Sequence, residues 1–152
     1  MRSLFFTMSL GLLPSMHAQI PNASFESWGG ESAPDGWSTN NSFGSFTISP
    51  ASDAHSGSLA AKGEILSNFN GDPYPPLLGC DVAVSQNPAQ LVGWYKFAPA
   101  AATVTMQVSV TGFDADQFLN GASGTTLIAA PQSDYGIFTV NISAPTGDPT
   151  AS

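Results

Sequence analysis

Side chains that could do chemistry are scarce in this sequence. Past residue 18 there is one histidine, His55, and one cysteine, Cys80, and one of each cannot by themselves make a zinc site. We interpret His55 as a loop residue, because it lies in a turn-forming run and nothing in the sequence places an Asp to orient its ring. Cys80 lies in an apolar run, which favours a small buried side chain over a reactive thiol.

Paired carboxylates are the remaining catalytic option. Asp114 and Asp116 are close in the sequence, as are Glu26 and Glu31. A retaining glycosidase needs two carboxyl groups about 5 Å apart across a cleft, whereas neighbouring acidic residues in a loop are usually solvated. Asp114 and Asp116 also lack the terminal Glu of an oxygen-rich calcium loop. We therefore interpret them as polar loop residues and expect the protein not to be an enzyme.

Aromatic residues carry more information than ionisable ones. In residues 91–97, strand alternation places Leu91 and Tyr95 on one face and Trp94 with Lys96 on the other. If Lys96 marks the face in water, the indole of Trp94 shares that face. A flat aromatic surface beside a cationic donor can stack on the apolar C–H face of a sugar ring. The alternative is that a loop or a second layer covers Trp94.

The elements that must position these side chains are strands. Residues 103–111 alternate apolar and polar types, with the apolar side chains on one face, and residues 135–143 repeat this pattern. Residues 20–26 are also expected to form a strand, whereas residues 112–124 are expected to form a long loop. Turn signals such as Pro34-Asp35-Gly36 separate about eight strands in all. The pattern predicts an all-β protein, either an antiparallel β-sandwich or a jelly roll.

The composition supports this fold class and excludes others. Charged residues are 9% of the chain, against about 25% in an average soluble domain, which argues against long charged helices and coiled coils. The net charge of −8 would repel a phosphate backbone, so no nucleic-acid partner is expected. Hydrophobic residues make up 42%, enough for a core. A length of 152 residues suits one domain.

The first 18 residues have the layout of a secretory signal peptide. Arg2 provides the positive start, residues 4–13 the apolar run and residues 15–18 the end at which cleavage occurs. The apolar run is about half the length that a bilayer span needs, so no membrane span is expected. We expect cleavage after Ala18, location outside the cell or at its surface, and a single β-sandwich domain over residues 19–152.

Four stretches, in order, carry a resemblance to a known family: residues 20–28 with the pattern Asn-x-x-Phe-Glu-x-Trp, residues 34–39, residues 56–62 and residues 91–97. They resemble the N-terminal jelly-roll module of secreted Bacteroidetes proteins, which often carry a type IX secretion sorting tail. Those modules are similar to galactose-binding-like carbohydrate-binding modules and to putative carbohydrate metabolism (PCMD) domains. The resemblance implies a non-catalytic, carbohydrate-binding-like module. The first hypothesis is therefore a module that binds a glycan or polysaccharide, in which Trp94 stacks on the sugar and Lys96 contacts its hydroxyl groups.

The resemblance also implies a structural calcium ion. In the carbohydrate-binding relatives the Glu of the opening pattern helps to hold it, which here is Glu26, with a backbone carbonyl near Gly57 or Ser58 as a second ligand. The alternative for Glu26 is an exposed carboxylate at a strand end. The resembling modules continue with one or two more strands, so we expect the domain to be incomplete at its C-terminus and the protein to continue past Ser152.

Two other functions remain open. The first is a structural or adhesion β-sandwich domain of a surface protein without a small-molecule ligand, in which the aromatic residues belong to the core. The other is a glycoside-active enzyme, which we rank below the binding module and the structural domain because the sequence shows no acid/base pair. The exposure of Trp94 distinguishes the binding module from the structural domain, because only a glycan-binding indole needs to be open to solvent.

Overall fold

The computed structural model describes residues 20–30, 33–42, 45–84, 88–99, 101–114, 116 and 119–144. The expected signal peptide and the expected continuation past Ser152 lie outside the described residues. Within them the chain forms ten strands in antiparallel pairs and no helix, so this part of the chain contains no helix long and apolar enough to cross a membrane. The predicted all-β antiparallel sandwich is confirmed, and the jelly-roll strand order stays a prediction.

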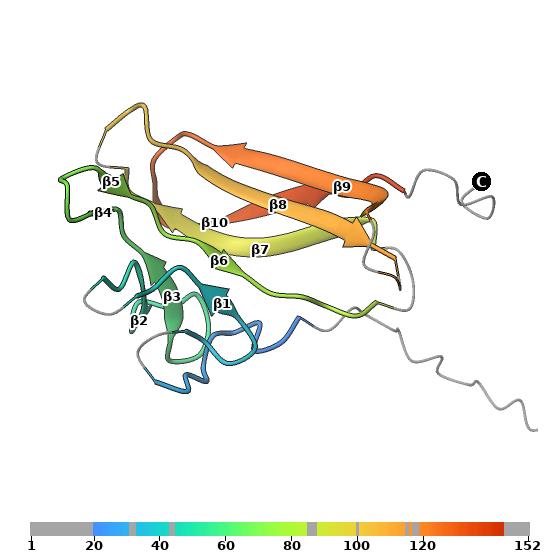
Figure 1. Ribbon diagram of the computed structural model, residues 1–152, viewed down its shortest axis with the longest axis horizontal. Coiled ribbons are helices and arrows are strands. Elements are labelled where there is room, and N and C mark those ends of the chain that lie inside the picture. The colour runs from blue at the N-terminus through green and yellow to red at the C-terminus, as the bar shows by residue number, and fades with distance from the viewer. Residues whose placement is uncertain are drawn as a thin grey trace, which may run out of the picture.

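Two long antiparallel pairs form the body of the sandwich. β7 (Gln90–Phe97) pairs with β10 (Gln132–Asn141), and β8 (Met106–Phe113) pairs with β9 (Leu119–Ile128). The β8–β9 hairpin lies over the β7–β10 pair as a second layer (Figure 1). Hydrogen bonds join the layers: the Thr126 hydroxyl donates to the Thr139 carbonyl at 2.6 Å, and the Ser143 amide donates to the Ser123 carbonyl at 2.9 Å.

Six short strands precede the long ones and gather at one side of the two layers (Figure 1). β1 (Ser38–Thr39) pairs with β6 (Leu78–Gly79), β2 (Ile48–Ala51) with β3 (Ala60–Gly63), and β4 (Leu66–Ser67) with β5 (Pro73–Tyr74). Two-residue strands contribute few ladder hydrogen bonds, so side chains must help to hold this part together.

A polar network supplies that support. The hydroxyl of the buried Thr47 donates to Oδ1 of Asn40 at 2.7 Å. The Asn41 side chain accepts from the Ile48 amide at 2.9 Å and donates to the Ile48 carbonyl at 2.7 Å. Asn40 also donates to the Pro75 carbonyl at 2.8 Å. Because buried polar groups must be paired, these bonds fix how the short strands lie against one another.

The long strands follow the predicted alternation of faces. In β8 the even-numbered residues are half-buried and the odd-numbered ones are exposed. In β7 the same alternation turns Tyr95 inward and Trp94 with Lys96 outward, which confirms the predicted faces. Few side chains of the described residues are fully enclosed; the buried apolar ones are Pro34, Ile48, Ala122, Ile128 and Val140.

The prediction of a long loop over residues 112–124 is wrong. The hairpin continues through this region, because Thr111 pairs with Ser123 and Phe113 pairs with Leu119. The register shifts between these two pairs, and Gly121 lies there with φ of 86°, a backbone conformation suited to glycine in a β-bulge. The bulge lets the two strands remain paired up to a short connection.

The prediction of a strand over residues 20–26 is also wrong. Asn22 and Phe25 have φ values of 42° and 58°, which lie outside the strand region. The Phe25 amide donates to the Asn22 carbonyl at 2.9 Å, so the segment forms turns. These turns carry Glu26, whose side chain contacts the amides of Ser58 and Leu59.

Candidate functional site

Three aromatic rings meet on the outer face of the β7–β10 pair. Trp94 points outward from β7 and is 48% exposed. The imidazole of His55 stacks on its indole, with ring centroids 3.8 Å apart and planes 12° apart, and Tyr135 meets His55 edge-on at 5.5 Å. We call Trp94, His55 and Tyr135 the aromatic platform. Its rings combine flat apolar surface with polar atoms at their edges.

An ion pair borders the aromatic platform. Nζ of Lys96 lies 3.0 and 2.8 Å from the two carboxylate oxygens of Asp53 and 4.7 Å from the centroid of the Tyr135 ring, a cation–π contact. The hydrogen bond to Asp53 is the main cause that raises the pKa of Lys96 above its usual range, so this amine stays charged. The Tyr135 hydroxyl donates to the backbone carbonyl of Asp53 at 2.5 Å. Lys96 and Tyr135 thus hold the loop of Asp53 and His55 against the sheet.

An irregularity in β10 accompanies Tyr135. Gln132 pairs with Phe97 and Gly136 pairs with Tyr95, and the register shifts between these two pairs, where Tyr135 lies. A bulge of this kind redirects side chains at the end of a sheet. Further along β10, Ile137 lies directly opposite Trp94 and is 56% exposed. Apolar surface therefore continues from the aromatic platform along this strand.

Glu26 anchors the far end of the loop that carries Asp53 and His55. Its Oε1 accepts hydrogen bonds from the amides of Ser58 at 2.8 Å and Leu59 at 3.0 Å. The adjacent Gly57 has φ of 76°, and a Cβ atom there would overlap that same oxygen, so the loop needs glycine at this position. The loop is therefore held at both ends, by Glu26 on one side and by the ion pair on the other.

This arrangement bears on the predicted calcium site. The groups that meet Oε1 of Glu26 are N–H donors, whose positive ends suit a carboxylate and not a cation. Among the described residues no group of three or more His, Cys, Asp or Glu side chains could hold a metal ion. The structure thus gives Glu26 the role of a backbone anchor, and the calcium ion stays a prediction.

The opening pattern around Glu26 forms a compact unit of turns. The Asn22 side chain donates to the Ser27 carbonyl at 2.6 Å and accepts from the Ser27 amide at 3.2 Å. The Trp28 indole N–H donates to the Phe25 carbonyl at 2.7 Å, and the Phe25 ring packs against Trp37 with centroids 5.1 Å apart. The spacing of Asn, Phe and Trp in this pattern is therefore explained by the structure, because these residues fix the backbone that carries Glu26.

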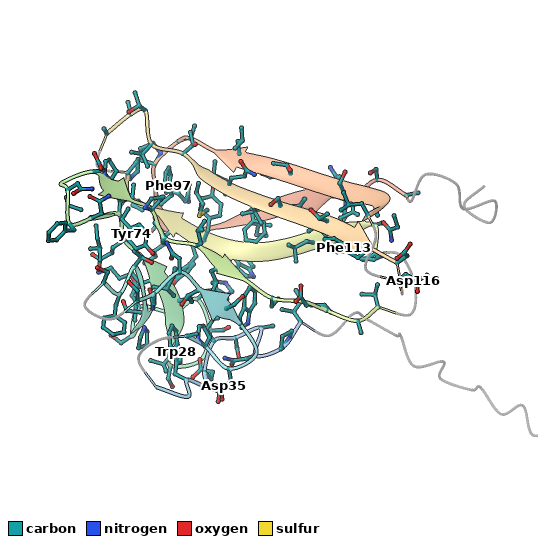
Figure 2. All side chains as sticks on the ribbon, in the orientation of Figure 1. Trp28, Asp35, Tyr74, Phe97, Phe113 and Asp116 are labelled. Atoms are coloured by element: carbon teal, nitrogen blue, oxygen red, sulfur yellow. The ribbon has the colours of Figure 1, made fainter. Side chains whose placement is uncertain are left out.

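The acidic pair of the β8–β9 connection lies elsewhere. Asp116 lies at one end of the molecule, and Phe97, which directly follows Lys96, lies at the other (Figure 2). Oδ1 of Asp114 accepts a hydrogen bond from the Asp116 amide at 3.0 Å, an interaction typical of a polar turn. The structure therefore does not bring this pair to Glu26 or to the aromatic platform.

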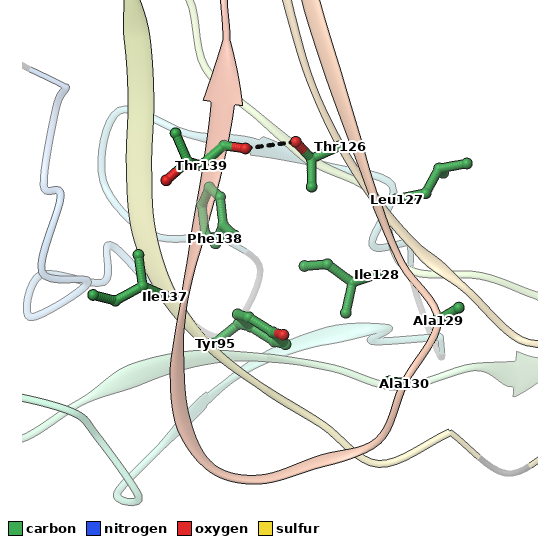
Figure 3. A pocket seen from close by; sticks show the side chains of 9 residues that line it. All are labelled: Tyr95, Thr126, Leu127, Ile128, Ala129, Ala130, Ile137, Phe138 and Thr139. Carbon is green, nitrogen blue, oxygen red and sulfur yellow. Dashed lines mark hydrogen bonds between the residues drawn. The ribbon is translucent and has the colours of Figure 1, made fainter.

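A cavity of about 310 Å³ lies between β9 and β10 (Figure 3). Tyr95, Ile128 and Phe138 line it with other mainly apolar residues, and the hydrogen bond from Thr126 to Thr139 crosses its rim. Its lining includes no carboxylate, imidazole, amine or thiol. The aromatic platform instead combines an exposed indole with an imidazole, a phenol and a charged pair, and we therefore take it as the candidate site.

Sequence reasoning found part of this site. Strand alternation predicted that Trp94 and Lys96 share the outward face, and the structure confirms this orientation. Sequence reasoning missed His55, Asp53 and Tyr135 as their partners. The alternation of residues 135–143 was a usable signal for Tyr135, because it puts this residue on the same face as Thr139. No local signal existed for Asp53, which is 43 residues before Lys96.

Cys80 takes no part in the site. It is half-buried, and burial, with a smaller effect of the Asp81 charge, raises the pKa of its thiol above the usual value. A protonated thiol is a poor nucleophile. This agrees with its interpretation as a small structural side chain.

No protein-family model, curated protein or solved structure matches this chain. The fold defines it as an antiparallel β-sandwich protein. The resemblance of its motifs to the Bacteroidetes jelly-roll modules stays a prediction.

Proposed function

We propose that this chain is a secreted, non-catalytic carbohydrate-binding module of the kind found in secreted Bacteroidetes proteins, and that it binds glycan at the aromatic platform. The observation that supports this proposal most is the half-exposed indole of Trp94 beside polar side chains. Secretion is inferred from the first 18 residues and the family from the four motif stretches.

The proposed binding uses the rings for stacking and the ion pair for hydrogen bonds. His55 covers part of Trp94, so the sugar ring stacks on the remaining indole surface or on the outer face of the imidazole. The Asp53 carboxylate, whose side chain is 69% exposed, accepts hydroxyl hydrogens. Lys96 is already bonded to Asp53, so its main role is to hold that carboxylate in place. A flat site covers little of a ligand, so affinity is modest.

Substitution of Trp94 tests the proposal. We expect Trp94→Ala to weaken binding to a neutral polysaccharide by about two- to tenfold, the range of one aromatic stacking contact. Native affinity electrophoresis in gels with galactomannan, xyloglucan or arabinoxylan measures this. Phe69→Ala is the matched control, because Phe69 is fully exposed and lies outside the aromatic platform. Equal retention of wild type and Trp94→Ala in every gel that retains wild type contradicts the proposal.

One observation favours the structural or adhesion domain as a second candidate. Val92 and Ile137, which flank Trp94 on the outer face, are 54% and 56% exposed. A row of exposed apolar side chains can also mark a surface that another domain covers. In that case Trp94→Ala leaves glycan retention unchanged, and so the same experiment separates the two functions.

A further inference from the structure

We infer that the aromatic platform selects uncharged glycans and rejects uronate- or sulfate-bearing ones. This inference rests on the proposed glycan-binding function and adds the substrate class. It follows from the way in which the few cationic side chains of this chain are used.

Both lysines that the structure describes are committed to ion pairs. Nζ of Lys62 lies 2.9 Å from a carboxylate oxygen of Glu64, and Lys96 contacts both carboxylate oxygens of Asp53. The one other Lys or Arg of the chain is Arg2, in the predicted signal peptide. A protein that binds anionic polymers presents uncompensated Lys or Arg side chains. The described surface offers none, and the whole chain has a net charge of −8.

At the aromatic platform itself, the exposed member of the ion pair is the acid. The side chain of Asp53 is 69% exposed, whereas that of Lys96 is 34% exposed and lies against the Tyr135 ring. An approaching ligand therefore meets a carboxylate. Two carboxylate oxygens are well matched to the hydroxyl donors of a neutral sugar, and they repel the carboxylate or sulfate of an acidic one.

Two variants with the same charge change test this inference. Asp53→Asn releases Lys96 at the aromatic platform, and Glu64→Gln releases Lys62 away from it; each removes one negative charge. The backbone carbonyl of Asp53 that accepts from Tyr135 is unchanged in the first variant. Native affinity gels with polygalacturonate or with galactomannan provide the acidic and neutral probes.

We expect wild type and Glu64→Gln to pass polygalacturonate without retardation. Asp53→Asn is expected to gain affinity for it by about two- to fivefold, the effect of one exposed ion pair, and to lose this gain in about 0.5 M salt. The same variant should bind galactomannan more weakly than wild type. Because a gain of binding cannot come from unfolding, the result separates selectivity from stability.

Where galactomannan retains wild type, equally strong retention of wild type on polygalacturonate overturns the inference. Identical behaviour of Asp53→Asn and Glu64→Gln on polygalacturonate overturns it as well. Failure of the proposed function has a different signature: wild type and Trp94→Ala then migrate alike in every neutral gel.

Discussion

Removal of the Glu26 carboxylate is expected to loosen the loop that carries half of the candidate site. Glu26→Ala deletes the acceptor of two backbone hydrogen bonds, from Ser58 and Leu59. It leaves the ion pair between Lys96 and Asp53, and the hydrogen bond from Tyr135 to Asp53, as the attachments at the other end of the loop. The variant should therefore be less stable and should hold His55 less firmly against Trp94.

The size of the effect follows from the two bonds. A hydrogen bond to a charged group contributes about 1.5–3 kcal/mol, and about 1 kcal/mol is a fair figure for each bond here, because the site is exposed and water replaces the lost acceptor. The total of about 2 kcal/mol is a substantial part of the 5–15 kcal/mol that usually stabilises a domain. It corresponds to a fall in Tm of about 4–8 °C for a chain of this size. Glu26→Gln keeps an acceptor oxygen and should lose about half as much.

Thermal unfolding followed by circular dichroism, with and without EDTA, measures this and also tests the calcium prediction. If Glu26 anchors the loop, EDTA leaves the Tm of wild type unchanged while Glu26→Ala lowers it. If Glu26 binds calcium, EDTA lowers the wild-type Tm and has no further effect on Glu26→Ala. A Tm of Glu26→Ala within about 1 °C of wild type refutes the reasoning, because it means that the two hydrogen bonds contribute nothing measurable.

Two further predictions concern packing and pH. Gly93→Ala should lower the free energy of unfolding in urea by about 1–3 kcal/mol, because the added Cβ would lie 2.5 Å from the Phe138 ring. Gly79→Ala is the control, because no atom lies within 4 Å of its added Cβ. Equal urea midpoints for the two variants would show that the Phe138 ring leaves room. Cys80 should react with iodoacetamide at pH 8.5 more slowly in the folded protein than in urea, since burial raises its pKa above the usual 9.0. Equal rates of alkylation in the two states, measured by mass spectrometry, would contradict the raised pKa. Because the folded state binds the thiol proton more tightly, the contribution of Cys80 to stability is complete below pH 9.0 and is lost as the pH rises through the folded pKa.

The outward orientation of Trp94 and Lys96 could be predicted because strand alternation is a local pattern. Each residue of β7 is placed by its immediate neighbours, and the period of two is regular over the whole strand. The assembly of the aromatic platform could not be predicted in this way. The hydrogen bond between Tyr135 and Asp53 joins residues 82 positions apart, and no short-range pattern records such a contact.

The continuation of the β8–β9 hairpin through residues 112–124 was missed for a different reason. The inner face of β9 has Ala122 and Gly124 where a typical strand has large apolar residues. A Cβ atom at Gly124 would overlap the backbone carbonyl of Asn141, so the close approach of β10 requires a small residue there. Because the close packing of β9 against β10 requires small residues on the inner face of β9, the sequence there lacks the alternation of large apolar and polar residues by which a strand is recognised.

The loop that Glu26 and Lys96 hold at its two ends has a consequence for how the site comes into being. The aromatic platform combines side chains from a loop after β2, from β7 and from the irregular segment of β10. None of these segments alone carries a recognisable part of it, and a chain that ended before Tyr135 would lack both the third ring and the strand that pairs with β7. The aromatic platform therefore forms only when β10 has joined the sheet, and a ligand bound there would stabilise the folded sandwich over partly folded forms in which β10 is unpaired.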